Sequence, residues 1–357
     1  MVKILGLSLY GPLAASTRYR LEQYIPGLSE YDIDLQVHHL LGDQYLRSRF
    51  EGARLPVAAL LKAGYERLSL LLRRQEFDAL IVHCELFPLM PGWLERLLLM
   101  KPYLYDFDDA FYLKYKTGNL SILRPLLSNK FDMVIEGAAA VTAGNKELIA
   151  YAQKINRNSY VLPTVVDTDR YHHVDHECDL TFTVGWIGSP STSKYLSELV
   201  LPLSVLGNEG PIRLVVVGGA APVVPNIEVI QERWEEQKEI FHINSFDVGV
   251  MPLPDNGWAR GKCAFKLIQY MACEVPVVAS RVGTNIDVVQ SDSGILVSNE
   301  NEWINALRKM RDQNRLRQQM GIAGRRRIIE NYSLHRNVPL LATIIDNMIR
   351  KRENPSA

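Results

Sequence analysis

The chain has 357 residues with 40 basic and 40 acidic side chains, so its formal net charge is zero and offers no overall field for nucleic acid. Hydrophobic residues make up 47% and charged residues 22%, as in soluble globular proteins, and this length favours two domains. No apolar run is long enough to span a membrane, and the four cysteines form no motif typical of zinc sites. We therefore expect a cytoplasmic protein with free thiols, no signal peptide, no metal and no cofactor.

The N-terminal stretch predicts a strand, a loop and a helix. Val2 to Leu9 is an apolar run typical of a buried strand, and Gly11 lies in the loop after it, where the backbone can approach a ligand. Ser16 or Thr17 is expected to cap a helix that runs to about Glu30. This order is typical of a Rossmann-like domain, but the G-x-G-x-x-G fingerprint is absent, which argues against a bound dinucleotide.

Two groups of basic residues follow. Arg18 and Arg20 stand in the first turns of this helix, where they either meet an acidic acceptor or are simply exposed. After a strand predicted at Ile33 to His38, the segment Arg47 to Arg74 mixes seven basic residues with leucines. Such a basic amphipathic helix can lie on the anionic inner face of a membrane. The alternative is a surface helix whose leucines face the sheet and whose arginines face water.

Three aspartates gather at the end of one predicted strand. Ala79 to His83 and Pro102 to Tyr105 are predicted to be parallel strands, and the second is followed by Asp106, Asp108 and Asp109. Carboxylates crowded at a strand end repel one another, which is a usual cause of a shifted pKa at a functional site. The alternatives are capping carboxylates in a loop and, as a further possibility, a metal site.

The middle of the chain indicates where the domains divide. Short strands are expected at Met133 to Ile135 and at Ala140 to Ala143. A polar stretch marks the predicted boundary, which gives three parts: residues 1–170, residues 171–331, and a final helix at residues 332–357.

The second predicted domain opens with a strand and a polar turn. Leu180 to Ile187 is the expected strand, and Gly188, Ser189 and Thr192 lie in the turn that leads into a helix. Hydroxyls and backbone amides at a helix start suit a phosphate or a sugar hydroxyl. We therefore expect these residues to bind substrate.

The most informative stretch predicts a strand at Asp247 to Pro252, a loop ending at Gly261 and a helix at Lys262 to Cys273. A helix that follows such a strand begins in the crevice where open α/β sheets bind ligands, and its free N–H groups favour an anion. Lys262 and Lys266 fall one turn apart on the same predicted face. The pattern indicates a phosphate-bearing ligand, with two solvated surface lysines as the alternative.

The segment Gly261 to Ala272, GKCAFKLIQYMA, and the strand after it resemble the C-terminal signature of the retaining glycosyltransferases of family GT4. That family usually carries two glutamates in this stretch, at positions that Gly261 and Gln269 occupy in this chain. The resemblance implies an α/β protein with the GT-B fold. Two Rossmann-like doubly wound domains would face a cleft, and a C-terminal helix would cross back to the first domain.

The resemblance also implies a function. A metal-independent, hexosyltransferase-like enzyme would move a sugar, with retention, from a nucleotide-diphosphate donor to a glycan or lipid-linked acceptor in cell-surface polysaccharide or glycolipid assembly. The donor would bind the second domain, where Lys262, Lys266 and Arg260 would stabilise the diphosphate. Gln269 would form a hydrogen bond with the ribose in place of the usual glutamate, because an amide keeps an acceptor oxygen.

Asp108 or Asp109 would orient the transferred sugar or stabilise positive charge on it.

The sequence leaves other functions open. The two missing glutamates suggest a catalytically silent sugar-nucleotide-binding partner subunit. A GT-B epimerase or phosphorylase lacks a matching signature here, and a nicotinamide-dependent oxidoreductase lacks its glycine fingerprint.

Overall fold

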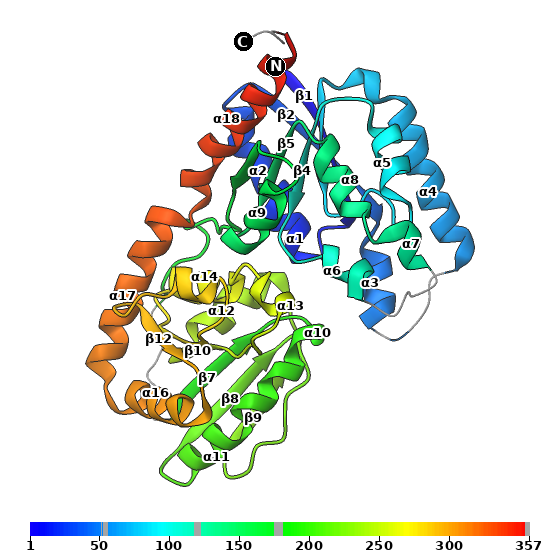
Figure 1. Ribbon diagram of the computed structural model, residues 1–357. Coiled ribbons are helices and arrows are strands. Elements are labelled where there is room, and N and C mark those ends of the chain that lie inside the picture. The colour runs from blue at the N-terminus through cyan, green and yellow to red at the C-terminus, as the bar shows by residue number, and fades with distance from the viewer. Residues whose placement is uncertain (51, 53–55, 118–122, 175–180, 354–357) are drawn as a thin grey trace. The chain divides into compact units, whose positions relative to one another are not determined.

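The computed structural model describes residues 1–50, 52, 56–117, 123–174 and 181–353 (Figure 1). Parts of the predictions above lie outside these described residues: residues 51 and 53–55 of the basic segment, Leu180 at the start of a strand, and residues 354–357 of the final helix.

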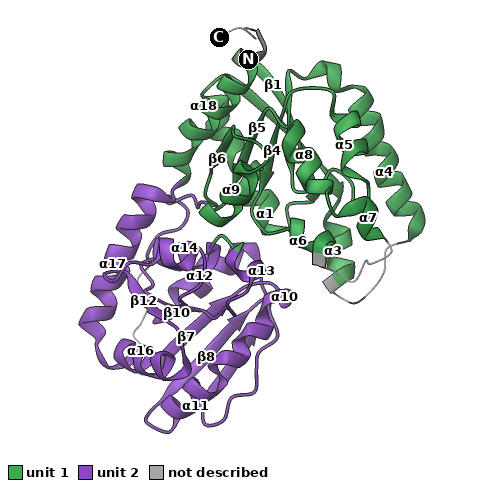
Figure 2. Cartoon of the chain, in the orientation of Figure 1, with its two compact units in different colours: residues 1–164, 261–263, 334–357 green, residues 165–260, 264–333 purple. Residues whose placement is uncertain are grey.

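Two compact units make up the chain (Figure 2). Unit 1 comprises Met1–Thr164, Gly261–Cys263 and Leu334–Ala357, and unit 2 comprises Val165–Arg260 and Ala264–Ser333. The first division lies a few residues before the predicted boundary, and the C-terminal segment belongs to unit 1, where the predicted returning helix would place it. The membership of Gly261–Cys263 in unit 1 is a feature that the sequence does not predict.

Unit 1 is built on a six-stranded parallel sheet in the order β2-β1-β3-β4-β5-β6. The order reverses between β1 and β3, so the carboxyl ends of these strands are the place where an open sheet of this kind binds ligands. Every residue of β3 and β4 is buried, as expected for central parallel strands. The strands are β1 (Val2–Tyr10), β2 (Ile33–Leu41), β3 (Ala79–His83), β4 (Tyr103–Phe107), β5 (Ala140–Ala143) and β6 (Ser159–Val161).

Helices surround this sheet, and the last one comes from the C-terminal segment (Figure 1). It packs beside α2 so closely that a Cβ on Gly27 would lie 2.8 Å from Val338 Cγ2, which explains a glycine within that helix. The helical elements of unit 1 are α1 (Ala15–Thr17), the π-helical turn η1 (Arg18–Glu22), α2 (Tyr24–Ser29), α3 (Asp43–Phe50), α4 (Val57–Leu72), η2 (Arg74–Glu76), α5 (Gly92–Leu99), α6 (Tyr112–Thr117), α7 (Arg124–Leu127), α8 (Lys130–Gly137), α9 (Lys146–Gln153) and α18 (Leu334–Glu353).

Unit 2 holds a second six-stranded parallel sheet, in the order β12-β11-β10-β7-β8-β9. This is the doubly wound Rossmann order, and it reverses between β7 and β10. Its core includes Trp186, Leu203 and Met310, which are almost completely buried. The strands are β7 (Phe182–Ile187), β8 (Ile212–Val217), β9 (Glu228–Glu232), β10 (Val248–Met251), β11 (Val277–Ser280) and β12 (Gly294–Val297).

Helices connect most of these parallel strands, whereas the connection from β8 to β9 contains none. The helical elements of unit 2 are α10 (Pro190–Ser193), η4 (Lys194–Leu199), α11 (Val200–Gly207), η5 (Glu236–Lys238), α12 (Glu239–Asn244), α13 (Gly257–Arg260), α14 (Phe265–Ala272), α15 (Asn285–Val288), α16 (Glu300–Asp312) and α17 (Asn314–Asn331).

Two local predictions are wrong. Met133 to Ile135 is part of helix α8 instead of a strand, because Phe131, Val134 and Ile135 are buried at helical spacing on one face. The helix after β1 is not capped by a hydroxyl: Thr17 Oγ1 donates instead to the Tyr10 carbonyl at 2.8 Å.

Candidate functional site

The ligand-binding edge of unit 2 is the point between β7 and β10 where the strand order reverses. Gly188, Ser189 and Thr192 follow β7 there, as the sequence predicts. Their polar groups partly satisfy one another, since Thr192 Oγ1 donates to the Ser189 carbonyl at 3.0 Å. The turn is thus held in one shape by its own hydrogen bonds.

Lys266, in the first turn of α14, lies against this turn. Its Nζ is 5.2 Å from the centre of the Trp186 ring, a cation–π arrangement. A Cβ on Gly188 would lie 2.5 Å from Lys266 Cε, so a larger residue there would displace the lysine from this position. The structure therefore places a cation beside the turn after β7, at the edge where open sheets of this kind bind ligands.

Lys262 does not share a helix face with Lys266, and that prediction is wrong. Ala264 has a φ of 53°, in the left-handed region, and α14 begins only at Phe265. Lys262 therefore lies before the helix, in the segment that belongs to unit 1.

Within unit 1, Lys262 Nζ lies 3.4 Å from Asp109 Oδ1. Asn145 holds the segment in place, because its Nδ2 donates to the carbonyls of Gly261 (2.9 Å) and Lys262 (3.1 Å). A Cβ on Gly261 would lie 2.6 Å from Ala110 Cβ, which accounts for the glycine by packing. Asn145 also caps helix α9, because its side chain accepts a hydrogen bond from Leu148 N, but its contact with residues more than 100 positions away is not contained in the local sequence.

Asp106 is a buried structural carboxylate. It pairs with Arg20, which donates from both Nε and a terminal nitrogen, and it also accepts from His83 Nδ1 (2.8 Å) and Thr142 Oγ1 (2.7 Å). Burial alone would raise the pKa of Asp106, but the Arg20 charge and these hydrogen bonds outweigh it and lower the pKa. Arg20 was predicted to contact an acidic acceptor substrate. It instead forms an ion pair with Asp106 inside unit 1.

Asp108 lies next to two residues that the sequence analysis missed, His83 and Cys84. His83 Nε2 is 3.2 Å from Cys84 Sγ and 3.8 Å from Asp108 Oδ1. Burial, followed by the charges of Asp108 and Asp106, raises the pKa of the Cys84 thiol well above its usual value. The thiol is thus unlike an activated nucleophile, whose pKa is lowered. A histidine at the end of a buried strand and a cysteine directly after it were the available sequence signal.

Gln269 is buried in unit 2. Its Nε2 donates to Glu239 Oε1 at 2.9 Å and to Tyr171 Oη at 3.1 Å, and Trp234 Nε1 donates to the other Glu239 oxygen at 2.6 Å. A glutamate at position 269 would set two carboxylates within hydrogen-bonding distance, so the amide fits the neighbouring Glu239. The ribose contact stays a prediction.

The remaining predicted binding residues are held by their neighbours. Gly11 packs against Asp43, since a Cβ on Gly11 would lie 2.6 Å from Asp43 Oδ1. Arg18 is buried and donates to the Pro12 carbonyl, while Arg260 is exposed and pairs with Asp255.

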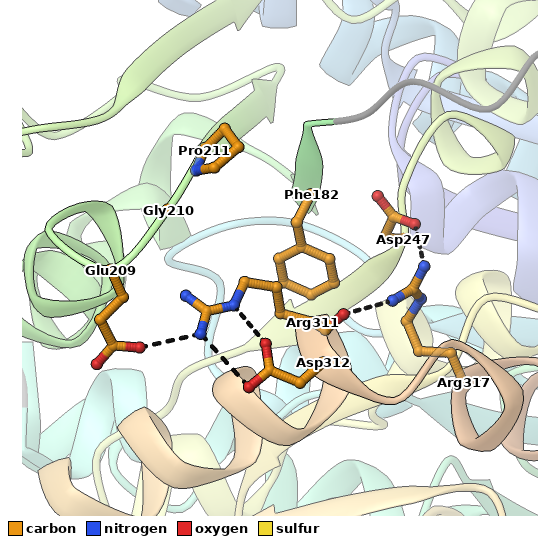
Figure 3. Close-up of a pocket in the computed structure, with 8 residues that line it drawn as sticks. All are labelled: Phe182, Glu209, Gly210, Pro211, Asp247, Arg311, Asp312 and Arg317. Carbon is orange, nitrogen blue, oxygen red and sulfur yellow. Dashed lines mark hydrogen bonds and ion pairs between the residues drawn. The ribbon is translucent and has the colours of Figure 1, made fainter.

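A pocket of about 360 Å³ lies at the opposite, amino edge of the unit 2 sheet (Figure 3). Phe182 begins β7 there, and Asp247 precedes β10. Its charged groups pair with one another, with Arg317 3.0 Å from Asp247 Oδ1 and Arg311 3.0 Å from Glu209 Oε2. Because its charged side chains are paired with one another, this pocket has a structural role.

Residues 181–313 match the family model described as glycosyl transferases group 1, which covers most of unit 2. No curated protein matches the chain in sequence.

Solved structures resemble the whole chain at low sequence identity. A sucrose-phosphate synthase from Thermosynechococcus elongatus is 14% identical, with a TM-score of 0.72 over 98% of this chain and 100% of its own. A glycosyltransferase from Rickettsia africae is 12% identical, with a TM-score of 0.69 over 98% of each chain. HepE from Anabaena, in complex with UDP, is 13% identical, with a TM-score of 0.66 over 97% of this chain and 100% of its own. The chain therefore has the GT-B fold.

Proposed function

We propose that this GT-B protein, whose residues 181–313 form a glycosyl transferases group 1 domain, is a nucleotide-sugar-dependent glycosyltransferase. The observation that carries the proposal is this domain match on a sheet whose ligand-binding edge bears Lys266 against the Gly188 turn. In our proposal unit 2 binds the donor, unit 1 binds a glycan or lipid-linked acceptor, and the reaction needs no cofactor.

The chemistry breaks the bond between the sugar anomeric carbon and the diphosphate, which leaves with a developing negative charge. A preorganised cation stabilises such charge best. Lys266 supplies it beside the turn of Ser189 and Thr192, and the Trp186 ring fixes the lysine in place. Because a fixed ammonium does this without a metal, we propose metal-independent transfer. Retention of the anomeric configuration, as in GT4 enzymes, belongs to the same proposal.

In unit 1, Asp108 and Asp109 are the carboxylates that remain after Asp106 is committed to Arg20. They are partly exposed at the carboxyl end of β4, the ligand-binding edge of that sheet. We propose that one of them orients the transferred sugar or stabilises its positive charge. Lys262, 3.4 Å from Asp109, would hold that carboxylate and contribute charge toward the leaving group.

A thermal-shift measurement tests donor binding on the full chain. UDP is the first probe, because the HepE structure holds UDP. A nucleoside diphosphate that binds the folded protein raises its Tm. We expect a rise with at least one of UDP, GDP and ADP, which Lys266→Ala reduces and the exposed control Lys309→Ala retains. Absence of a shift with every nucleoside diphosphate would contradict donor binding.

A second candidate function is a sugar-nucleotide-binding partner without catalysis. Gly261 and Gln269 favour it, because both family glutamates are replaced. It predicts the same thermal shift but no turnover of any donor, so turnover separates the two.

Helix α4 carries an observation that favours contact with a membrane. Five apolar residues on one face are exposed, at spacings of three and four residues: Val57 (70%), Leu61 (70%), Tyr65 (72%), Leu68 (41%) and Leu72 (78%). The predicted alternative, with leucines on the sheet and arginines in water, holds only in part, because Leu71 is buried and Arg73 is exposed. Arg67 is buried as well, and it donates to the carbonyls of Ser8 and His38.

We propose that α4 lies in the surface of an anionic membrane, at the inner face, where a lipid-linked acceptor would be presented. A helix with one exposed apolar face and flanking basic residues binds in the plane of such an interface. Figure 1 shows α4 along the outer side of unit 1, next to α5, whose Trp93 and Leu97 are also exposed. No helix of the described chain combines the length and hydropathy needed to cross a bilayer.

A further inference from the structure

We propose that His83, Cys84 and Asp108 form a binding site for one zinc-type divalent cation at the carboxyl ends of β3 and β4. The ligand atoms form a compact triangle: His83 Nε2 is 3.2 Å from Cys84 Sγ and 3.8 Å from Asp108 Oδ1, which is 4.0 Å from the sulfur. A point equidistant from the three atoms lies about 2.1 Å from each, within the ~2.0–2.3 Å range of zinc–ligand distances. The three atoms are therefore close enough together to bind one ion.

The orientation of His83 supports the site. Asp106 is ion-paired with Arg20 and accepts a hydrogen bond from His83 Nδ1 at 2.8 Å. An ionised carboxylate only accepts, so the proton of a neutral ring is on Nδ1 and the lone pair is on Nε2. That lone pair faces the other two ligands. A carboxylate behind a histidine in this way is the usual support of a metal-binding histidine.

The backbone at Cys84 also fixes the site. Its φ is 63°, a conformation that L residues rarely adopt. It is held by two hydrogen bonds, from Cys84 N to the Asp106 carbonyl (2.9 Å) and from Tyr105 Oη to the Cys84 carbonyl (2.6 Å). A rare backbone conformation that its surroundings enforce is common at functional sites.

The donor set selects the class of ion. One sulfur, one nitrogen and one oxygen suit zinc better than magnesium or calcium, which prefer oxygen. Three protein ligands leave a fourth position open, on the side of Asp108, whose side chain is 15% exposed against 2% for His83. On binding, the Cys84 S–H bond breaks, a sulfur–metal bond forms, and the proton passes to solvent.

One consequence rests on the proposed function. If Asp108 faces the transferred sugar, an ion at this site withdraws that carboxylate, so Zn²⁺ should inhibit transfer and a chelator should reverse the inhibition. The binding itself does not depend on the reaction, so it is tested on the protein alone.

The experiment titrates the full chain with Co²⁺ and follows thiolate-to-cobalt charge-transfer absorption. We expect saturation at one Co²⁺ per chain and displacement by Zn²⁺, which binds such sites more tightly. Cys84→Ser should abolish the charge-transfer band, and Asp108→Asn should weaken binding by roughly 100-fold. Cys273→Ala, which removes a buried thiol of unit 2, should leave the titration unchanged.

Absence of the band in the wild-type chain would overturn the proposal, as would a band that Cys84→Ser retains or that Cys273→Ala removes. If Cys84→Ser does not fold, Asp108→Asn decides, because it changes a partly exposed side chain. Unchanged Co²⁺ affinity in that variant would also exclude the site.

Discussion

Lys266 and Lys262 are four positions apart in the chain and lie in different units, yet both are proposed to act on the leaving diphosphate. We expect Lys266→Ala and Lys262→Ala each to lower kcat/KM by about 10²-fold, the effect of losing one preorganised charge-stabilising group. Steady-state kinetics with Lys309→Ala as the matched surface control checks this. Turnover near the wild-type level in both variants would restore the alternative of two surface lysines.

Asp108 and Asp106 provide a contrast at the level of single residues. Asp108→Asn should keep a cooperative melt near that of the wild type while losing most transferase activity, because Asp108 is partly exposed and proposed to face the sugar. Asp106→Asn should destabilise the fold, since breaking a buried ion pair costs about 3–5 kcal/mol.

Melting temperature and specific activity measured on one preparation decide the role of Asp108. A capping role predicts the reverse pattern for Asp108→Asn, with a lower Tm and intact specific activity in the folded fraction.

The free energy of unfolding should depend on pH through His38, which contacts Arg67 of helix α4. Burial, and then the charge of Arg67, lower the pKa of His38 to about 4, and Arg67 Nε lies 3.2 Å from His38 Nδ1. The folded state therefore binds fewer protons than the unfolded state, whose histidine pKa is ~6.5. Stability from this residue is present above that value and lost as the pH falls toward about 4.

Urea unfolding between pH 7 and pH 5 checks this effect. The wild type should lose more stability over this range than His38→Gln, which keeps an acceptor for Arg67 but does not titrate. Parallel pH profiles for the two proteins would show that His38 is not responsible.

The exposed face of α4 predicts lipid-dependent binding. Co-sedimentation with liposomes should require acidic lipid and weaken as salt is raised. Leu61→Glu and Leu72→Glu should each reduce binding by roughly tenfold or more, because a fully buried leucine contributes about 1.5–3 kcal/mol. Leu201→Glu, an exposed leucine of unit 2, is the control. Equal sedimentation with neutral and acidic vesicles, or none with either, would contradict the membrane proposal.

Elements with strong local patterns could be predicted, and those set by distant contacts could not. Strands β3 and β5 have their predicted bounds, because buried parallel strands are continuous apolar runs. The apolar run at Met133 to Ile135 was too short to separate strand from helix.

Other features of the site depended on contacts that a local pattern does not contain. Because Ala264 is left-handed, Lys262 lies outside the helix, and Arg67 is buried although the arginines of this segment were expected to face water. The contact of Lys262 with Asp109, 153 residues apart, could be found only in the folded chain.

At the scale of the whole molecule, the two Rossmann-like sheets offer two kinds of site. Unit 2 presents a lysine at the edge of its sheet where ligands bind, and unit 1 presents two partly exposed carboxylates at the corresponding edge of its own. Each unit alone would be an ordinary ligand-binding domain. Their presence in one chain with the GT-B fold favours transfer of a group from a bound nucleotide.

Release of nucleoside diphosphate from a panel of nucleotide sugars, with and without candidate acceptors, tests this central claim most directly. We predict acceptor-dependent release from at least one donor, unchanged by EDTA and about 10²-fold slower in Lys266→Ala. No release from any donor, from a chain that still gains thermal stability with a nucleoside diphosphate, would contradict the transferase and leave a sugar-nucleotide-binding protein. Release that requires a divalent metal would contradict metal-independent transfer.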